Sequence, residues 1–128
     1  MLYKVLVVDD EVPVRDLLSD LLKRENCSVN ICGTGEEALD LLKKDSFDVV
    51  LLDIKLPGIS GLEVLKNIRD TNKNLPVIMI TGFGYNEDLI SKSKEFGCSG
   101  YIGKNMPVAQ IISTFKQFVE KQKSEDNL

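Results

Sequence analysis

The sequence predicts an α/β domain with a doubly wound, five-stranded parallel sheet. Short apolar runs rich in β-branched residues, at 5–8, 49–52 and 77–80, are typical of strands buried on both faces. Strand and helix signals alternate five times along the chain, which is the pattern of a parallel sheet with crossover helices. Right-handed crossovers and the strand order 2-1-3-4-5 are expected, the flavodoxin-like arrangement of a three-layer sandwich.

The first third of the chain predicts two strands and one helix. The first strand is expected over 4–8, and Pro13, a residue favoured in a first turn, opens the first helix. One face of this helix is apolar and comprises Val14, Leu17, Leu18, Leu21 and Leu22. The segment 28–32 alternates polar and apolar residues, as an edge strand does.

Two capping boxes mark the starts of the second and third helices. Thr34 precedes Glu37, and Ser60 precedes Glu63, at the spacing of an N-cap hydroxyl and its partner acid. A buried strand is expected at 48–52 and a turn at 57–58. The expected inward-facing residues are Ala38, Leu41 and Leu42 in the second helix and Leu62, Leu65 and Ile68 in the third.

The last third of the chain predicts two strands, 77–80 and 100–102, and two helices. The helix at 86–96 ends at Gly97 and has the weakest apolar pattern, so we expect it to be the easiest element to shift. The final helix carries the apolar residues Val108, Ile111, Ile112, Phe115, Phe118 and Val119. These elements define a domain over 1–120 and a polar, frayed tail over 121–128.

Composition excludes several classes of function. A chain of 128 residues suffices for one domain, and a net charge of −4 argues against direct nucleic-acid binding. No apolar stretch reaches membrane length, and the first strand leaves no room for a signal peptide. Three cysteines without metal-binding spacing fit reduced thiols in a cytoplasmic protein. Because the chain has no histidine, a phosphoryl group used here must come from another molecule.

Three carboxylates are expected to meet at one edge of the sheet. Asp9 and Asp10 follow the first strand and Asp53 follows the third, on either side of the predicted switch point. Their mutual repulsion requires a cation, and Mg²⁺ prefers oxygen ligands. The backbone carbonyl of Lys55 is placed to be a further ligand. An ionised aspartate beside such an ion is also a potential nucleophile toward phosphorus.

Two further side chains complete this edge. Thr81 ends the fourth strand and is able to donate to a phosphoryl oxygen, and Lys104 follows the fifth strand and is able to neutralise a second one. Singly, such residues are ordinary turn, strand-end or solvated side chains. Their joint position at one end of the sheet predicts a phosphoryl site.

Four segments, 7–11, 52–63, 80–82 and 101–104, resemble the receiver domains of bacterial two-component response regulators. The resemblance covers nearly the whole chain. It implies that Asp53 accepts a phosphoryl group from the phosphohistidine of a histidine kinase or a histidine phosphotransferase. It implies Mg²⁺, with Mn²⁺ as an alternative, bound by Asp10, Asp53 and the Lys55 carbonyl, with Asp9 acting through water.

The same resemblance implies a switch. Thr81 turns toward the phosphoryl group, Tyr101 rotates inward, and the face formed by the fourth helix, fifth strand and fifth helix changes its preference for an output protein or domain. Such a domain is no enzyme in the usual sense, but it promotes its own phosphorylation and slow dephosphorylation. It is expected to be a monomer or a weak dimer.

Details of the motifs point to two branches of the family. Lys55 resembles the single-domain receivers of sporulation-type phosphorelays, and with Phe83 it is expected to shield the acyl phosphate from water. The loop 81–84 instead resembles receivers that precede ATPase-type transcription activators. Lys104 is followed by Asn105 where the family has proline after a cis bond, so either a cis bond costing about 3 kcal/mol or a rearranged trans loop is expected.

Other functions remain as alternatives. A metal-dependent phosphohydrolase with an aspartyl nucleophile needs a second acid two residues after that nucleophile. This chain has Lys55 at that position. A nucleotide-binding flavodoxin-like domain needs a glycine-rich phosphate loop, which follows no predicted strand. A phosphorylation-independent receiver-like binding module conflicts with the complete set of site residues. The chain is also compatible with a receiver excised from a multidomain DNA-binding regulator.

Overall fold

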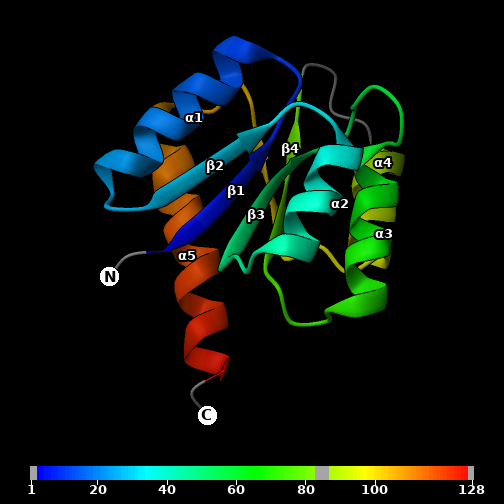
Figure 1. Ribbon diagram of the computed structural model, residues 1–128. Coiled ribbons are helices and arrows are strands. Elements are labelled where there is room, and N and C mark those ends of the chain that lie inside the picture. The colour runs from blue at the N-terminus through cyan, green and yellow to red at the C-terminus, as the bar shows by residue number, and fades with distance from the viewer. Residues whose placement is uncertain (1–2, 83–86, 127–128) are drawn as a thin grey trace.

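The computed structural model describes residues 3–82 and 87–126, the last six by their backbone alone. Five strands alternate with five helices (Figure 1). The strands are β1 (Lys4–Val8), β2 (Ser28–Cys32), β3 (Val49–Asp53), β4 (Val77–Thr81) and β5 (Gly100–Gly103). The helices are α1 (Val12–Arg24), α2 (Gly35–Lys44), α3 (Gly61–Thr71), α4 (Glu87–Glu95) and α5 (Val108–Asp126).

The sheet is parallel throughout and has the order β2-β1-β3-β4-β5, which confirms the predicted fold class and strand order. Helices α1 and α5 cover one face, and α2, α3 and α4 cover the other (Figure 1). Two hydrophobic cores result, one on each side of the sheet. The strands β1, β3 and β4 contribute to both cores, because successive side chains of a strand point to opposite faces.

Both predicted N-caps are present. The Thr34 hydroxyl accepts a hydrogen bond from the Glu37 amide at 3.1 Å, and the Ser60 hydroxyl accepts one from the Glu63 amide at 3.2 Å. Gly97, two residues after the last residue of α4, has φ +91°, the left-handed conformation expected of a residue that ends a helix. Local side-chain chemistry therefore sets where these helices begin and end.

Some burial predictions from periodicity are wrong. Leu17 is 46% exposed, because the buried face of α1 is centred on Leu18, Leu21 and Leu22 and Leu17 lies at its flank. In α3 Val64, which is not among the expected inward-facing residues, is fully buried, whereas Leu62 is only partly buried. Val108, one of the apolar residues of α5, is exposed in the first turn of that helix. Periodicity identifies a helical face but not which flank of that face meets the sheet.

The C-terminal segment differs from the prediction of a frayed tail. Helix α5 continues to Asp126 without a break at residue 120. The residues of this segment include no glycine or proline, so their intrinsic preferences permit the helix to continue.

The loop after β5 resolves the alternatives for Asn105. No peptide bond in the described residues is cis, so the bond between Lys104 and Asn105 is trans. The Met106 amide donates to the Gly103 carbonyl at 3.1 Å, which closes a turn. The Pro107 carbonyl then accepts the first hydrogen bonds of α5, so Pro107 lies one residue before the helix.

Candidate functional site

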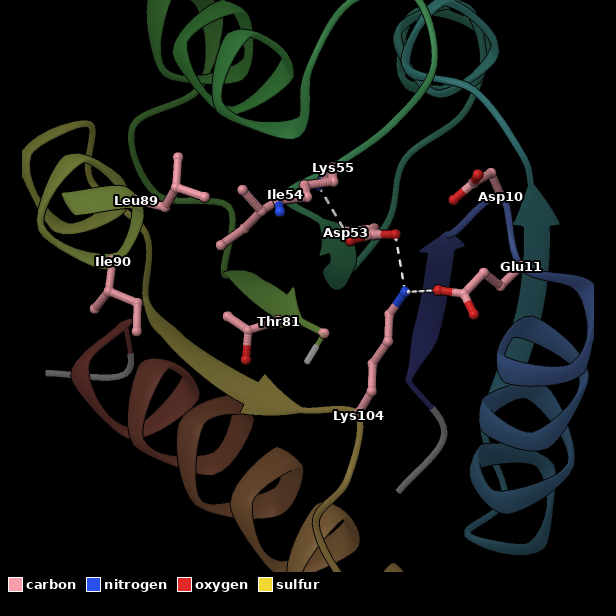
Figure 2. Close-up of a pocket in the computed structure, with 10 residues that line it drawn as sticks. Asp10, Glu11, Asp53, Ile54, Lys55, Thr81, Leu89, Ile90 and Lys104 are labelled. Carbon is pink, nitrogen blue, oxygen red and sulfur yellow. Dashed lines mark hydrogen bonds and ion pairs between the residues drawn. The ribbon is translucent and has the colours of Figure 1, made fainter. Parts of the chain in front are cut away.

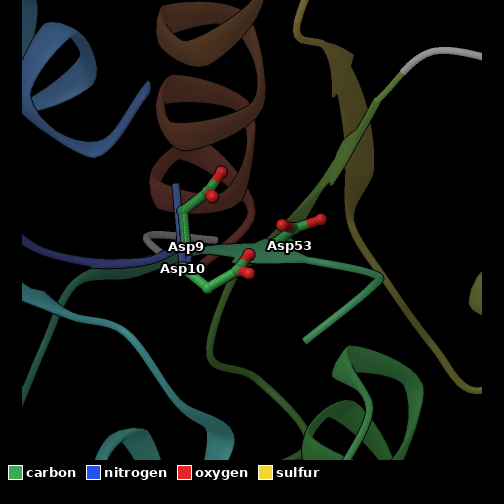
Figure 3. Close-up of side chains that lie close together, drawn as sticks. All are labelled: Asp9, Asp10 and Asp53. Atoms are coloured by element: carbon green, nitrogen blue, oxygen red, sulfur yellow. The ribbon is translucent and has the colours of Figure 1, made fainter. Parts of the chain in front are cut away.

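Three carboxylates converge where β1 and β3 end, as the sequence predicts (Figure 3). Val8 pairs with Leu52 in the parallel register, so the next residues of both strands, Asp9 and Asp53, lie side by side. One oxygen from each of Asp9, Asp10 and Asp53 lies within 4.8 Å of the other two. Asp9 is fully buried and Asp53 is 3% exposed, whereas Asp10 is exposed to solvent.

Backbone amides orient the two buried carboxylates. Asp9 Oδ1 accepts a hydrogen bond from the Glu11 amide at 2.9 Å, and Asp53 Oδ1 accepts one from the Lys55 amide at 3.2 Å. Each aspartate side chain thus accepts a hydrogen bond from the backbone amide two residues later. This bond closes a turn that short carboxylate side chains favour. The Oδ2 atom of Asp53 is left for other partners.

Lys104 supplies the positive charge of the site (Figure 2). Its Nζ lies 2.6 Å from Glu11 Oε1, 3.0 Å from Asp53 Oδ2 and 3.2 Å from Asp9 Oδ2. Its backbone amide donates to the Thr81 carbonyl at 2.8 Å, which ties the lysine to the end of β4.

Burial and hydrogen bonds with oppositely charged partners have opposite effects on the pKa of Asp53 and on that of Lys104. Burial raises the pKa of Asp53 to about 6; the hydrogen bond from Lys104 opposes the shift, and the charge of Asp9 adds to it. Burial alone would lower the pKa of Lys104, but its hydrogen bonds with Glu11 and Asp53 raise it above the usual range. Lys104 therefore stays charged, while Asp53 holds its ionised form at a cost in stability.

Replacing Asp53 with asparagine is expected to stabilise the metal-free protein above pH 6 but not below pH 4. Between the usual value of 3.8 and the folded value of about 6, the folded state binds more protons than the unfolded state. The stability of the wild type therefore falls as pH rises through this window. A two-unit shift corresponds to roughly 2–3 kcal/mol at pH 7.

Urea denaturation in EDTA at pH 4, 5, 6 and 7, followed by circular dichroism, measures this difference. Asp40→Asn, at an exposed position of α2, is the control and should show no such rise with pH. A constant difference between Asp53→Asn and the wild type across the series would contradict the expectation.

A cavity of about 300 Å³ opens beside Asp53 (Figure 2). It is lined by Asp10, Glu11, Asp53, Ile54, Lys55, Thr81, Gly82, Leu89, Ile90 and Lys104. The Thr81 hydroxyl is 3.5 Å from the Ile102 carbonyl, a long hydrogen bond that is easily exchanged for a better acceptor. The cavity combines carboxylate, hydroxyl and ammonium groups around the side chain of Asp53.

The donor set of the cavity fits a hard divalent cation. Four acids, Asp9, Asp10, Glu11 and Asp53, gather here, and the ammonium of Lys104 lies between three of them, Asp9, Glu11 and Asp53. The buried Oδ2 of Asp9 accepts no hydrogen bond from the described residues, despite its nearness to Lys104. Oxygen ligands and excess negative charge are the conditions that Mg²⁺ and similar ions require.

Not every predicted residue lies in this cavity. Tyr101 lies on β5, partly buried against the core beneath α3 and α4, with Lys94 Nζ 5.6 Å from its ring centroid. Phe83 lies outside the described residues. Glu11 contacts Lys104 closely but had no role in the sequence interpretation, although a third acid directly after Asp9 and Asp10 was the available signal.

The fold and the cavity together define a class of protein. A flavodoxin-like sheet whose switch point carries an acidic cluster and a lysine, rather than a glycine-rich phosphate loop, is suited to hold a cation and a phosphoryl group and not a dinucleotide. The family comparison agrees, since the model of the response regulator receiver domain matches residues 5–116. The chain belongs to the response regulator receiver domain family and acts in two-component or phosphorelay signalling.

Several relatives are similar over the whole domain. Sporulation initiation phosphotransferase F of Bacillus subtilis (strain 168) is 34% identical over 116 residues, which cover 91% of this chain and 93% of the relative. A CheY-like receiver domain protein of Methanospirillum hungatei JF-1 is 29% identical with a TM-score of 0.90, covering 98% of this chain and 99% of that structure.

A longer protein also contains this fold. NtrX of Brucella abortus, solved in complex with ADP, is 31% identical with a TM-score of 0.92 over 99% of this chain. The chain spans only 29% of that NtrX chain, so the likeness extends to its receiver-like part alone. In the described part of the present chain, no helix combines the length and apolar character needed to cross a bilayer.

Proposed function

We propose that Asp53 is the phosphoacceptor of this receiver domain. The observation that supports this most directly is its position at the end of β3, with Oδ2 beside the cavity and 3.0 Å from Lys104 Nζ. A lone pair of Asp53 forms the new O–P bond as the N–P bond of a partner's phosphohistidine breaks. The released imidazole nitrogen keeps the electron pair of the broken bond and takes up a proton from solvent.

We assign the other groups of the cavity to binding and charge neutralisation. Asp10, Asp53 and the Lys55 carbonyl would hold Mg²⁺, or Mn²⁺, with Asp9 acting through water. The ion supplies positive charge against the phosphoryl oxygens. Lys104 would exchange its contact with Asp53 Oδ2 for a phosphoryl oxygen, and the Thr81 hydroxyl would donate to another.

We further propose that phosphorylation switches the face formed by α4, β5 and α5. Helix α4 buries only Ile90 and Ser93, so its displacement costs few contacts. In the proposed switch Thr81 moves toward the phosphoryl group and Tyr101 turns inward, which changes the surface presented to an output protein or domain.

The likeness to a sporulation phosphotransferase supports a phosphorelay partner, either a histidine kinase or a histidine phosphotransferase. The likeness to part of NtrX keeps the alternative of a receiver within a larger regulator. A cytoplasmic location, a monomeric or weakly dimeric state, slow self-dephosphorylation and shielding of the acyl phosphate by Lys55 stay predictions.

Incubation with Mg²⁺ and phosphoramidate, followed by intact-mass measurement, tests the proposal. The wild type is expected to gain one phosphoryl group, and Asp53→Ala none. Asp40→Ala, an exposed acid of α2, should gain it as the wild type does, and EDTA should abolish the gain. A wild type without added mass would favour the phosphorylation-independent binding module, and added mass on Asp53→Ala would refute Asp53 as the acceptor.

A further inference from the structure

The loop between β3 and α3, residues 54–60, is fixed at its far end by a side chain from another helix. Glu36, in the first turn of α2, accepts a hydrogen bond from the Ile59 amide at 3.0 Å through its Oε1 atom. The two residues are 23 positions apart in the sequence, so this bond joins two separate crossover connections. It is a charge-assisted bond to a backbone amide, a strong kind of hydrogen bond.

The same carboxylate lies against the turn at Gly58. Gly58 has φ +74°, and a Cβ built there would lie 2.7 Å from Oε1 and 2.9 Å from Oε2 of Glu36. The positive φ favours glycine at this position, and the absence of a Cβ lets the Glu36 carboxylate pack against the turn. The Glu36 carboxylate therefore packs directly against the loop at residues 58 and 59.

The near end of the loop is tied to the site itself. The Lys55 amide donates to Asp53 Oδ1 at 3.2 Å, and the Gly61 amide, just after the loop, donates to the Ile54 carbonyl at 2.8 Å and so joins the two ends of the loop. The Lys55 carbonyl, which the proposed function assigns to the metal, therefore lies between these anchors and the one formed by Glu36.

Helix α2 provides a rigid base for Glu36. Its N-cap Thr34 is hydrogen-bonded, and Gly35 packs so closely that an added Cβ would lie 2.6 Å from Val64 Cγ2 and 2.7 Å from Ile59 Cγ1. The start of α2 is consequently held against both the loop and α3. The backbone of this turn is therefore a fixed point of attachment for the Glu36 side chain.

We propose that Glu36 is a positioning residue of the phosphoryl site. By binding the Ile59 amide and the Gly58 turn, it sets the path of residues 54–60 and so the place of the Lys55 carbonyl, without touching metal or phosphoryl group. This inference rests on the proposed function, because it assigns Glu36 a part in metal binding.

Calorimetric titration with Mg²⁺ on Glu36→Ala, Glu36→Gln and Glu37→Ala tests the proposal. Glu36→Ala is expected to bind Mg²⁺ about tenfold more weakly, as for other residues that orient metal ligands from outside. Glu36→Gln keeps an acceptor oxygen and should bind within twofold of Glu37→Ala. All three variants lose one negative charge from the same helical turn, so a difference between them is not electrostatic.

Hydrogen exchange in the absence of metal supplies a second readout. The Ile59 amide should be protected in the wild type, in Glu36→Gln and in Glu37→Ala, and should lose protection in Glu36→Ala. Thermal midpoints in EDTA confirm that every variant is folded. Retained protection of Ile59 in Glu36→Ala would overturn the proposal.

The outcomes separate this proposal from the proposed function. Equal Mg²⁺ binding by Glu36→Ala and Glu37→Ala, with normal binding by the wild type, would overturn the positioning role alone. Glu36→Gln binding as weakly as Glu36→Ala would do the same. A wild type that neither binds Mg²⁺ nor accepts a phosphoryl group would overturn both.

Discussion

Replacing Gly61 with alanine is expected to destabilise the protein by about 3 kcal/mol, the upper end of the usual cost of overpacking. A Cβ at Gly61 would lie 1.9 Å from the carbonyl oxygen of Asp53 and 2.9 Å from the Cα of Ile54. Because these atoms are backbone, no change of side-chain conformation relieves the clash. Either the end of β3, with Asp53, or the start of α3 must move.

Urea denaturation in EDTA measures this effect, and Gly82→Ala is its control. A Cβ at Gly82 would meet only Lys104 Cδ at 3.9 Å, an ordinary contact, although Gly82 lines the same cavity. Gly82→Ala should therefore differ little from the wild type in stability. Equal stability of the two variants would show that the approach of α3 to Asp53 is looser than the structure has it.

Replacing Lys104 with methionine is expected to slow phosphorylation by phosphoramidate about 100-fold while strengthening Mg²⁺ binding. Removing a charged donor from a developing negative charge typically costs two to three orders of magnitude in rate. The same ammonium, however, competes with a metal ion for oxygens of Asp53 and Asp9, at 3.0 and 3.2 Å. Loss of this competitor leaves the acids without a counter-charge and so favours the ion.

The opposite signs of these two effects distinguish a role in transfer from general damage to the fold. Rates are measured by intact mass at saturating Mg²⁺, and affinities by calorimetry. Lys116→Met removes another paired lysine, 3.2 Å from Glu25, and should change neither quantity. Weaker Mg²⁺ binding by Lys104→Met would mean that the lysine organises the acids rather than competing for them.

Local signals predicted most of the fold. Apolar runs identified β1, β3 and β4 to within one residue, because a strand buried on both faces has no polar position to interrupt it. The hydroxyl and acid pairs at Thr34 and Ser60 placed two helix starts correctly, since a cap acts over three residues. Periodicity failed at Leu17, where burial depends on the angle at which the helix lies on the sheet.

The acidic site was predictable for a related reason. Parallel strands all end at the same edge, so strand order alone brings Asp9, Asp10, Asp53, Thr81 and Lys104 together. The sequence does not decide whether the bond before Asn105 is cis or trans. Asparagine stands here where the family has proline, and no local pattern shows which conformation the loop then adopts. The structure has this bond trans.

The sequence by itself determined the fold class, the strand order and the residue types at the acidic edge, because each depends on short-range patterns and on the general rules of parallel sheets. Only the tertiary structure decided that Glu11 contacts Lys104, that α3 approaches the Asp53 backbone at Gly61, and that Glu36 binds the Ile59 amide. These contacts join residues brought together by the packing of separate connections. Their distances are set by how helices and loops pack on the sheet, which no local pattern of the chain encodes.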